Sequence, residues 1–351
     1  MIYLTLYVVL SLFMGIATLV PLLPQAHGLV RTFDFPRVQL AIMLLGLLFL
    51  GPFCFGWTVI LLVLYGLLGF CLAIQLVKIV RYTPLVKVQA RTAKPHTIER
   101  GRVIKFLVAN VLQYNRRYED LCDRISRENA DICVFMETDQ PWVDALQKRA
   151  EGYENRLERA QDNTYGIILW SKFKLEEADI RFLVREDIPS IHATVSVPDS
   201  SFRFRLYVVH PEPPDPVSQT VERDAELVMI GMEVADDSLP CIVTGDLNDV
   251  AWSRTTERFQ KLSGLLDPRI GRGLFSSFHA KYWFARWPLD HLFHSDDFSL
   301  VNIKRLAYTG SDHFPMVFEL IFEPETNSEN KPVTANDTDK QEVKDLLQTV
   351  K

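Results

Sequence analysis

Two patterns of hydrophobic residues divide the chain near residue 80. Residues 1–23 and 38–77 contain no charged side chain, and runs of this length can cross a membrane as helices. The second run holds 40 residues. As one helix it would be roughly 60 Å long, twice the thickness of a bilayer core, so it must fold back. Gly51-Pro52 and Gly56 favour a break there. We predict three spans, at about residues 1–23, 36–53 and 56–80.

Beyond residue 100 the pattern is that of an α/β domain. Short apolar runs predict buried strands, and segments of helical period lie between them. Helices are predicted over 118–129 and 217–235, and Ser253 is placed to cap a third helix that ends before Gly264. This mixture favours α/β packing around sheets. The predicted strands are residues 103–109, 132–136, 166–170, 202–209, 241–244, 289–293 and 316–321.

Two further segments show no strong period. Residues 81–100 carry prolines and many basic side chains, and we expect a basic linker over an anionic membrane surface. Residues 324–351 are polar and rich in Asn, Thr, Lys and Glu, which predicts a disordered tail. The expected organisation is therefore a membrane region over 1–80, the linker, a compact domain over 101–323, and the tail.

Charge is distributed unevenly along the chain. The formal charge is +6 over residues 1–100, −10 over 101–323 and −2 over 324–351, within a total of −6. Basic residues occur in the first loop between spans and after the third span, so the positive-inside rule predicts a cytoplasmic domain. An acidic domain lacks the basic surface that duplex DNA binding normally uses. The five cysteines form no CxxC pair, which argues against a zinc ribbon or a disulfide scaffold.

Carboxylates, amides and histidines occur where the predicted strands begin or end. Asp246 and Asn248 follow a buried strand, and a period of two places them on the same side. Asp290 lies between apolar residues, where a buried carboxylate needs a partner. Taken singly, each feature is also compatible with an ordinary turn or a solvated loop. The full set is Asn110, Glu137, His210, Asp246, Asn248, Asp290, Asp312 and His313.

In this order, the set resembles the endonuclease/exonuclease/phosphatase superfamily over about residues 101–322. Val108-Ala109-Asn110-Val111 is similar to the opening strand of that family, and residues 131–137 are similar to its glutamate strand. Gly245-Asp246-Leu247-Asn248 and Ser311-Asp312-His313 resemble its two most diagnostic motifs. The resemblance implies a four-layered α/β sandwich of two packed mixed sheets flanked by helices. Here three transmembrane helices precede it, as in a bacterial branch of the superfamily, which implies an inner-membrane protein.

The resemblance also implies a divalent-metal site. Glu137 would be the main metal ligand, and Asn110 and Asp312 would lie close to the ion. Oxygen ligands of this kind suit a hard cation such as Mg²⁺ or Mn²⁺, and the absence of a Cys/His cluster in the sequence argues against zinc.

The remaining roles come from the same resemblance. Asp246 would deprotonate the attacking water, and Asn248 would hold the phosphate and the water in line. His313 would stabilise charge that develops on the phosphorus oxygens, and Asp290 would support the site. His210 would contact the phosphate from the opposite side, and the acid that protonates the leaving group stays open.

Four arginines are candidate substrate contacts, because the guanidinium fork matches phosphate oxygens. The alternative is that they form salt bridges within an acidic domain. They are Arg254, Arg269, Arg272 and Arg286.

The expected activity is hydrolysis of a phosphoester by a membrane-anchored, metal-dependent phosphodiesterase. The anchor confines the site near lipid headgroups, so a phospholipid or a small phosphodiester is at least as reasonable a substrate as nucleic acid. A nuclease of the same superfamily is the second interpretation. The third is a non-catalytic, membrane-tethered interaction module. The bilayer is the expected partner, and no protein partner is predicted.

Overall fold

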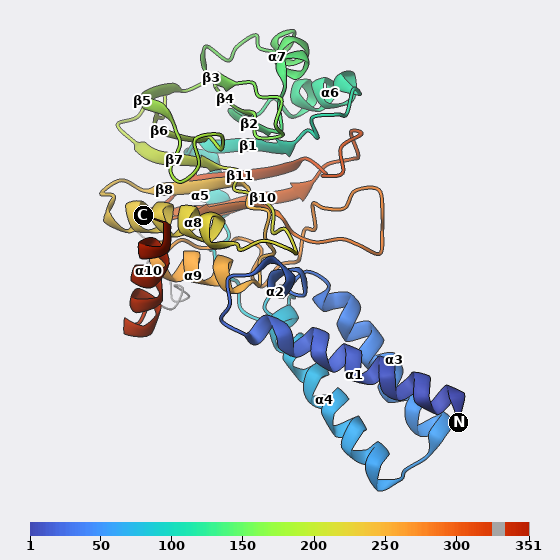
Figure 1. Cartoon of the computed structure of the whole chain (residues 1–351). Coiled ribbons are helices and arrows are strands. Elements are labelled where there is room, and N and C mark those ends of the chain that lie inside the picture. The colour runs from blue at the N-terminus through green and yellow to red at the C-terminus, as the bar shows by residue number, and fades with distance from the viewer. Residues whose placement is uncertain (325–333, 351) are drawn as a thin grey trace.

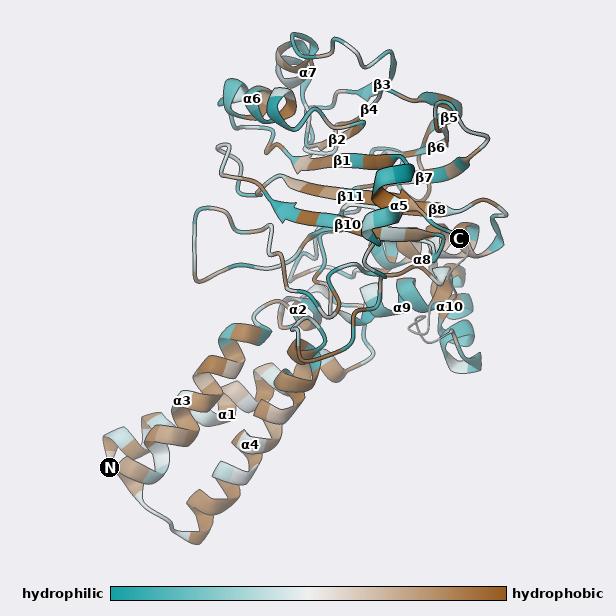
Figure 2. Ribbon diagram, turned by 180° about the vertical axis from the view of Figure 1, so that it is seen from behind, coloured by the Kyte–Doolittle hydropathy of each residue, from teal (hydrophilic) through white to brown (hydrophobic). Residues whose placement is uncertain are grey.

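A bundle of apolar helices joins a layered α/β domain in the computed structural model, which describes residues 1–324 and 334–350 (Figure 1). Three segments are long and apolar enough to cross a membrane, as predicted: Ile2–Leu22, Arg37–Phe55 and Val59–Val80. The first comprises helix α1 (Ile2–Leu19) and the short 3-10 helix η1 (Val20–Leu22), and the others are α3 and α4. Figure 2 shows that hydrophobic residues dominate these helices. A short helix, α2 (Gly28–Thr32), lies in the loop between η1 and α3.

The turn between α3 and α4 differs in part from the prediction. Pro52 lies inside α3, which continues to Phe55 and ends at Gly56, where φ is 76°. Thr58 then caps α4. The break at Gly56 is confirmed and the break at Pro52 is wrong, because one proline is tolerated in an apolar helix when its neighbours cover the freed carbonyl.

Polar side chains cross-link one end of the helix bundle. Arg37 Nη1 donates to Gln75 Oε1 at 3.1 Å, and Gln75 Nε2 donates to Thr18 Oγ1 at 3.0 Å. Asp34 forms a buried ion pair with Arg37. The three helices are therefore held in a fixed arrangement where they meet the α/β domain.

Two mixed sheets form the centre of that domain. The strand orders are β10-β11-β1-β2-β4-β3 and β5-β6-β7-β8-β9. β1 pairs with β2 in parallel, as β7 does with β8, and the other neighbours are antiparallel. The strands are β1 Val103–Asn110, β2 Ile132–Met136, β3 Asn155–Arg159, β4 Ile167–Ser171, β5 Lys174–Arg181, β6 Ser190–Ser196, β7 Arg203–Val209, β8 Cys241–Asp246, β9 Asp290–His294, β10 Phe298–Arg305 and β11 Met316–Phe322.

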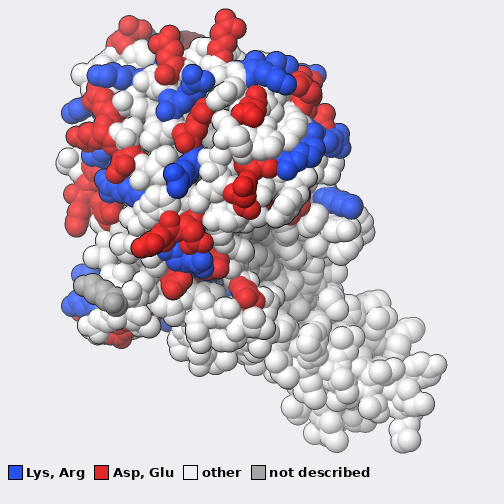
Figure 3. All heavy atoms as spheres, turned by 45° about the horizontal axis from the view of Figure 1, so that its top comes forward, with Lys and Arg blue, Asp and Glu red and all other residues white. Residues whose placement is uncertain are grey.

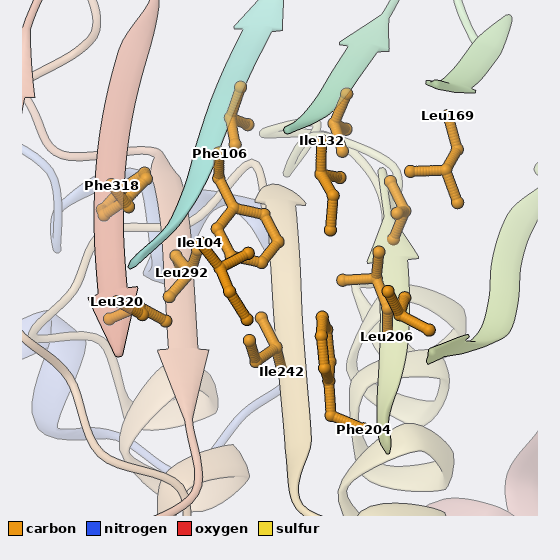
Figure 4. Packing of buried hydrophobic residues seen from close by; sticks show 14 of the residues in the cluster. Ile104, Phe106, Ile132, Leu169, Phe204, Leu206, Ile242, Leu292, Phe318 and Leu320 are labelled. Atoms are coloured by element: carbon orange, nitrogen blue, oxygen red, sulfur yellow. The ribbon is translucent and has the colours of Figure 1, made fainter. Parts of the chain in front are cut away.

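Successive side chains of a strand point to opposite faces of its sheet, and this alternation separates the core between the sheets from the contacts with the outer helices. On β1, Phe106 and Val108 point into the core between the sheets, whereas Leu107 and Ala109 point to the outer helices. Figure 4 shows Phe106 close to Phe204 of the other sheet, with ring centroids 6.4 Å apart. Helices α6 (Tyr118–Glu128) and α7 (Gln140–Gln147) cover one sheet, and α8 (Val221–Asp236) and α9 (Arg254–Ser263) cover the other. The domain is the four-layered sandwich that the sequence predicts.

Residues 81–100 do not form a loose linker. Tyr82 is buried, and its hydroxyl donates to Ala251 O at 2.7 Å. Thr92 pairs with Leu300 of β10, and Ala93 N donates to Leu300 O at 2.8 Å. The segment ends in helix α5 (Pro95–Arg100). The expectation of a linker over the membrane surface is wrong, because apolar side chains within the basic segment pack on the domain.

The tail is also ordered over part of its length. Helix α10 occupies Asp337–Val350, where the sequence analysis expects disorder. Its acidic side chains pair with basic ones of α9: Lys261 Nζ lies 3.0 Å from Asp339, and Glu342 contacts both Arg254 and Arg258. Charge complementarity thus orders a segment that has little apolar surface. The rest of the predicted tail, residues 325–333 and 351, lies outside the described residues.

Candidate active site

The polar residues of the predicted set meet at one edge of the two sheets. Asn110 ends β1, Glu137 follows β2 and Asp246 ends β8. Asp246 N donates to Met136 Sδ at 3.2 Å, which joins the sheets at this edge. Within its own sheet, Gly245 lets β8 lie close to β7, because its φ is 144° and an added Cβ would lie 1.9 Å from Val209 O.

Asn110 lies between two carboxylates of the site, those of Glu137 and Asp246. Its amide Nδ2 donates to Glu137 Oε1 at 2.8 Å and to Asp246 Oδ2 at 3.0 Å, and Leu112 N donates to its Oδ1 at 3.0 Å. The other Asp246 oxygen accepts from Asn248 N at 2.9 Å. Glu137 and Asn248 both have positive φ values, 60° and 50°. For glutamate this conformation costs on the order of 1 kcal/mol or more, and the surrounding bonds hold it in place.

His313 lies between two buried carboxylates. Its Nδ1 is 2.7 Å from Asp290 Oδ2, and its Nε2 is 3.5 Å from Asp246 Oδ2. The Ser311 hydroxyl donates to Asn110 O at 2.8 Å and accepts from His313 N at 3.0 Å, which fixes this loop against β1. Although burial disfavours a charged ring, Asp246 and Asp290 raise the pKa of His313 to about 10. The ring is therefore an imidazolium at neutral pH.

Negative charge at the site exceeds positive charge. Burial, reinforced by the carboxylates of Asp246 and Asp312, raises the pKa of Glu137 to about 7. Four carboxylates, counting Asp290, face a single imidazolium. Asp246, Asp290 and His313 also offer ligand atoms within 4.8 Å of one another. Both ring nitrogens of His313 already face carboxylates, however, so the oxygen atoms of Glu137 and Asp312, which line the cleft, are the more open ligands for a hard cation.

His210 directly follows β7, and Asn248 lies two residues after the end of β8. His210 is buried, and burial lowers its pKa to about 4, so its ring is neutral. Among the described residues, its Nδ1 has no hydrogen-bond partner. Asn248 Nδ2 donates to Pro211 O at 3.0 Å and thereby holds the loop that carries His210. Glu212, in the same loop, pairs with Arg185 at 3.1 Å.

Three of the four predicted arginines have partners within the fold. Arg254 pairs with Glu342 at 2.6 Å, and the buried Arg269 binds Asp267 at 2.8 Å and contacts His291. Arg272 donates to Ala90 O at 2.7 Å. Arg286 lies over the Phe314 ring, 5.2 Å from its centroid. None of the four lines the cleft beside the carboxylates, and the partners of the first three match the alternative of internal pairing.

A cleft of about 590 Å³ opens at this edge, and Glu137, Asn248, Asp312 and His313 line it. Sequence reasoning missed much of the remaining wall. Thr32, Phe35 and Pro36 come from the loop before α3, and the aromatic residues Phe278 and Trp287 come from the loop before β9. The sequence offered one signal for this wall. Residues 278–287 contain five aromatic residues, which is unusual for a loop that is exposed to water.

The fold and the site together define a class of enzymes that hydrolyse phosphoester bonds. The sequence profile of the Endonuclease/Exonuclease/phosphatase family matches residues 107–313, more than half of the chain, and the chain belongs to this family. Its members are nucleases, phosphatases and phosphodiesterases, and they generally depend on a divalent metal. A search of the curated proteins finds no match.

Several solved structures share the fold. A humanized TDP2 of D. rerio is 18% identical, with a TM-score of 0.52 over 62% of this chain and 98% of that one. The mannosyl-6-phosphatase of Bacteroides thetaiotaomicron is 21% identical, with a TM-score of 0.52 over 62% and 100%. The human Nocturnin catalytic domain, with bound sulfate, is 16% identical, with a TM-score of 0.52 over 63% and 93%. At these identities the likeness concerns the fold alone.

Proposed function

We propose that this chain is a membrane-anchored, divalent-metal-dependent phosphoesterase that acts by in-line attack of an activated water. The observation that carries the proposal is the convergence of Asn110, Glu137, Asp246 and His313 beside one open cleft. These groups come from separate strands, and each is held by hydrogen bonds before a substrate arrives. Such positioning is what electrostatic catalysis requires.

Glu137 and Asp312, with Asn110 beside them, would hold the metal. The excess of carboxylates over cations supports this assignment, because buried negative charge needs a counter-charge. The family relationship favours Mg²⁺ or Mn²⁺. A bound ion would supply Lewis acidity toward the phosphoryl oxygens.

The protein groups divide the remaining work. Asp246 accepts a proton from the attacking water, and Asn248, anchored to Pro211 O, orients the phosphate. The His313 imidazolium, held by Asp290, donates to the phosphorus oxygens as charge develops. His210 is neutral and has a free Nδ1 within the described part of the chain, so it contacts the phosphate from the far side.

Surface charge favours a compact substrate over a duplex. On the face shown in Figure 3, acidic and basic side chains are mixed over the α/β domain and do not form a continuous basic track. The formal charge of residues 101–323 is −10. Because non-specific binding to duplex DNA depends on neutralised phosphates, a nuclease acting on long DNA is the weaker candidate.

Topology belongs to the same proposal. Basic residues at the domain side of the bundle, among them Arg37, Lys78 and Arg81, favour a cytoplasmic α/β domain. A reporter fused after Lys351 tests this placement. Activity of a periplasmic alkaline phosphatase reporter, without signal from a cytoplasmic one, would overturn it.

The test of the activity is hydrolysis of bis(p-nitrophenyl) phosphate by the full chain in detergent micelles, with Mg²⁺, Mn²⁺ or EDTA. Asp246→Asn and His313→Gln should each lower metal-dependent turnover by about 10²–10⁴-fold. Glu226→Gln makes the same kind of change at a buried carboxylate of α8 outside the site, and it should keep turnover. Metal-independent turnover, or full activity in both site variants, would refute the proposal. A folded protein without turnover under any metal would favour the non-catalytic module.

A further inference from the structure

The membrane region contributes one wall of the catalytic cleft. Glu137, Asn248, Asp312 and His313 line one side, whereas Thr32, Phe35 and Pro36 line another. Thr32 ends α2, and Phe35 and Pro36 immediately precede α3, which begins at Arg37. A substrate bound at the catalytic groups therefore also contacts the segment that leads into a membrane-length helix.

The length of α3 sets the height of that wall above the bilayer core. The helix has 19 residues. At 1.5 Å per residue it is about 28 Å long, which is close to the roughly 30 Å thickness of the hydrocarbon layer. A helix of this length spans the layer without excess, so it begins near the edge of the layer when it lies close to the bilayer normal. Phe35 and Pro36, one or two residues earlier, consequently lie at the depth of the lipid headgroups.

A series of aromatic rings in contact runs from Phe35, at the level of the headgroups, to the ring of His313. Phe35 meets Trp287 edge to face with centroids 5.7 Å apart, Trp287 stacks on Phe278 at 5.8 Å, and Phe278 lies 5.0 Å from the His313 ring. Apart from the catalytic groups, the cleft is lined mainly by apolar residues, including three prolines of the 211–216 loop. An apolar wall of this kind suits a hydrocarbon or glyceride portion better than a sugar or a base with many hydrogen-bonding groups.

The loop before α3 is fixed in this position. Gly28 N donates to Ser218 O at 2.9 Å, and Thr220 N donates to Ala26 O at 2.9 Å. Arg31 is buried and pairs with Asp224 of α8 at 3.3 Å. The wall is thus a built part of the domain, since backbone and side-chain bonds both hold it.

A second feature points to the same bilayer surface. The loop before β9 carries three consecutive aromatic residues, and Tyr282, Trp283 and Phe284 are 44%, 79% and 59% exposed. Gln39 Nε2, in the first turn of α3, donates to Phe284 O at 2.7 Å. The exposed rings therefore lie level with the start of the span, where tryptophan and tyrosine are enriched in membrane proteins.

We propose that the substrate is a phosphoester of a membrane lipid. Its phosphate would meet the catalytic groups, its apolar part would lie along Phe278, Trp287 and Phe35, and the Trp283-Phe284 tip would insert among the headgroups. In the reaction, the oxygen of water bonds to phosphorus while the bond from phosphorus to one ester oxygen breaks. The proton that Asp246 takes from water ends on the released alcohol, so the step needs no other reactant. This inference rests on the proposed function.

The experiment uses the full chain reconstituted in phosphatidylcholine vesicles with Mg²⁺ or Mn²⁺. The lipid probes are phosphatidic acid, phosphatidylglycerol and the vesicle phosphatidylcholine itself, and the soluble probes are their deacylated counterparts, glycerol 3-phosphate, glycerophosphoglycerol and glycerophosphocholine. At least one lipid should be hydrolysed, at a rate roughly tenfold or more above that of its deacylated counterpart. The double variant Trp283→Ser/Phe284→Ser should lose most of the lipid turnover and keep turnover of bis(p-nitrophenyl) phosphate. Phe182→Ser, at an exposed aromatic residue directly after β5, is the matched control and should change neither.

Each other outcome is informative. Hydrolysis of the soluble probes at the same rate as the lipids, or of bis(p-nitrophenyl) phosphate but of none of the three lipids, would overturn the inference and leave the proposed function intact. Failure to hydrolyse any phosphoester would remove both. Lipid turnover that the double variant leaves unchanged would refute the role of the aromatic tip.

Discussion

Replacing Arg31 and replacing Asp224, the two members of one ion pair, should destabilise the protein to different extents. Both side chains are buried, and the ion pair joins the loop that lines the cleft to α8. Asp224 also accepts from Arg223 Nη2 at 2.7 Å and from Thr255 Oγ1 at 3.1 Å. Burial would raise the pKa of Asp224, but Arg223 and Arg31 outweigh it and lower that pKa below its ordinary value. The stabilisation is therefore complete at neutral pH and is lost only as the pH falls through the lowered folded pKa.

The two variants differ in which buried groups lose a partner. Asp224→Asn leaves two buried arginines without their shared carboxylate, and breaking a buried pair in this way costs about 3–5 kcal/mol. Arg31→Met removes a 3.3 Å contact, while Asp224 keeps Arg223. It also removes two buried donors, Nε and Nη1, that have no hydrogen-bond partner among the described residues. Because the lost bond costs about 1–3 kcal/mol and removal of the two unpartnered donors returns at least as much, Arg31→Met should cost no more than about 1 kcal/mol.

Thermal unfolding of the full chain in detergent micelles, followed by near-UV circular dichroism at pH 7.5, measures the difference. At about 2–4 °C per kcal/mol, Asp224→Asn should lower the Tm by about 10 °C and Arg31→Met by only a few degrees. Asp179→Asn, at an exposed partner of Arg181, is the control and should leave the Tm nearly unchanged. An equal fall in Tm for Asp224→Asn and Arg31→Met would show that the two unpartnered donors of Arg31 do not offset the stabilisation by its ion pair.

Three further changes have defined outcomes. Gly28→Ala should lower the free energy of unfolding by about 1–3 kcal/mol and open the cleft, because the added Cβ would lie 1.7 Å from Asp215 O. Gly46→Ala is the control and should be neutral, because its Cβ would have nothing within 4 Å. Burial raises the pKa of Glu226 to about 8, so stability should fall as the pH rises from about 4.5 to 8. Glu226→Gln should flatten that slope in Tm measurements across this range, and an unchanged slope would contradict the assignment. Ser311→Ala should lower kcat of the phosphodiester assay by about tenfold with little change in KM, since it frees the catalytic loop from β1; an unaltered kcat would count against this role.

The strands that are both apolar and buried could largely be predicted from sequence, and the strands rich in polar residues could not. β2 was predicted at its observed bounds, and Ser253 caps α9 as expected, accepting from Thr256 N at 3.0 Å. β3 and β5 were missed because they are polar edge strands whose side chains are only half-buried or exposed. β6 was missed for the opposite reason, since it is almost wholly buried but contains serine, histidine and threonine.

For the site, the sequence order of the polar residues was sufficient to predict a cluster. What it could not predict was the wall contributed by the loop before α3. Phe35 and Glu137 are about 100 residues apart, and no periodicity relates a loop between spans to a strand end. The same limit applies to arginines, because the sequence does not reveal that Asp267 or Glu342 lies close enough to bind them.

The pairing of residues 92–93 with β10 has a consequence for how the domain must be handled. β10 is the outermost strand of its sheet, and an uncovered outer strand offers free backbone groups to other chains. The segment that follows α4 bonds to both backbone polar groups of Leu300, since Leu300 N donates to Arg91 O at 2.8 Å and Leu300 O accepts from Ala93 N. A soluble fragment that starts at residue 95 would lack this cover and should self-associate in a concentration-dependent way. We therefore expect the connection to the apolar helices to protect the domain against aggregation as well.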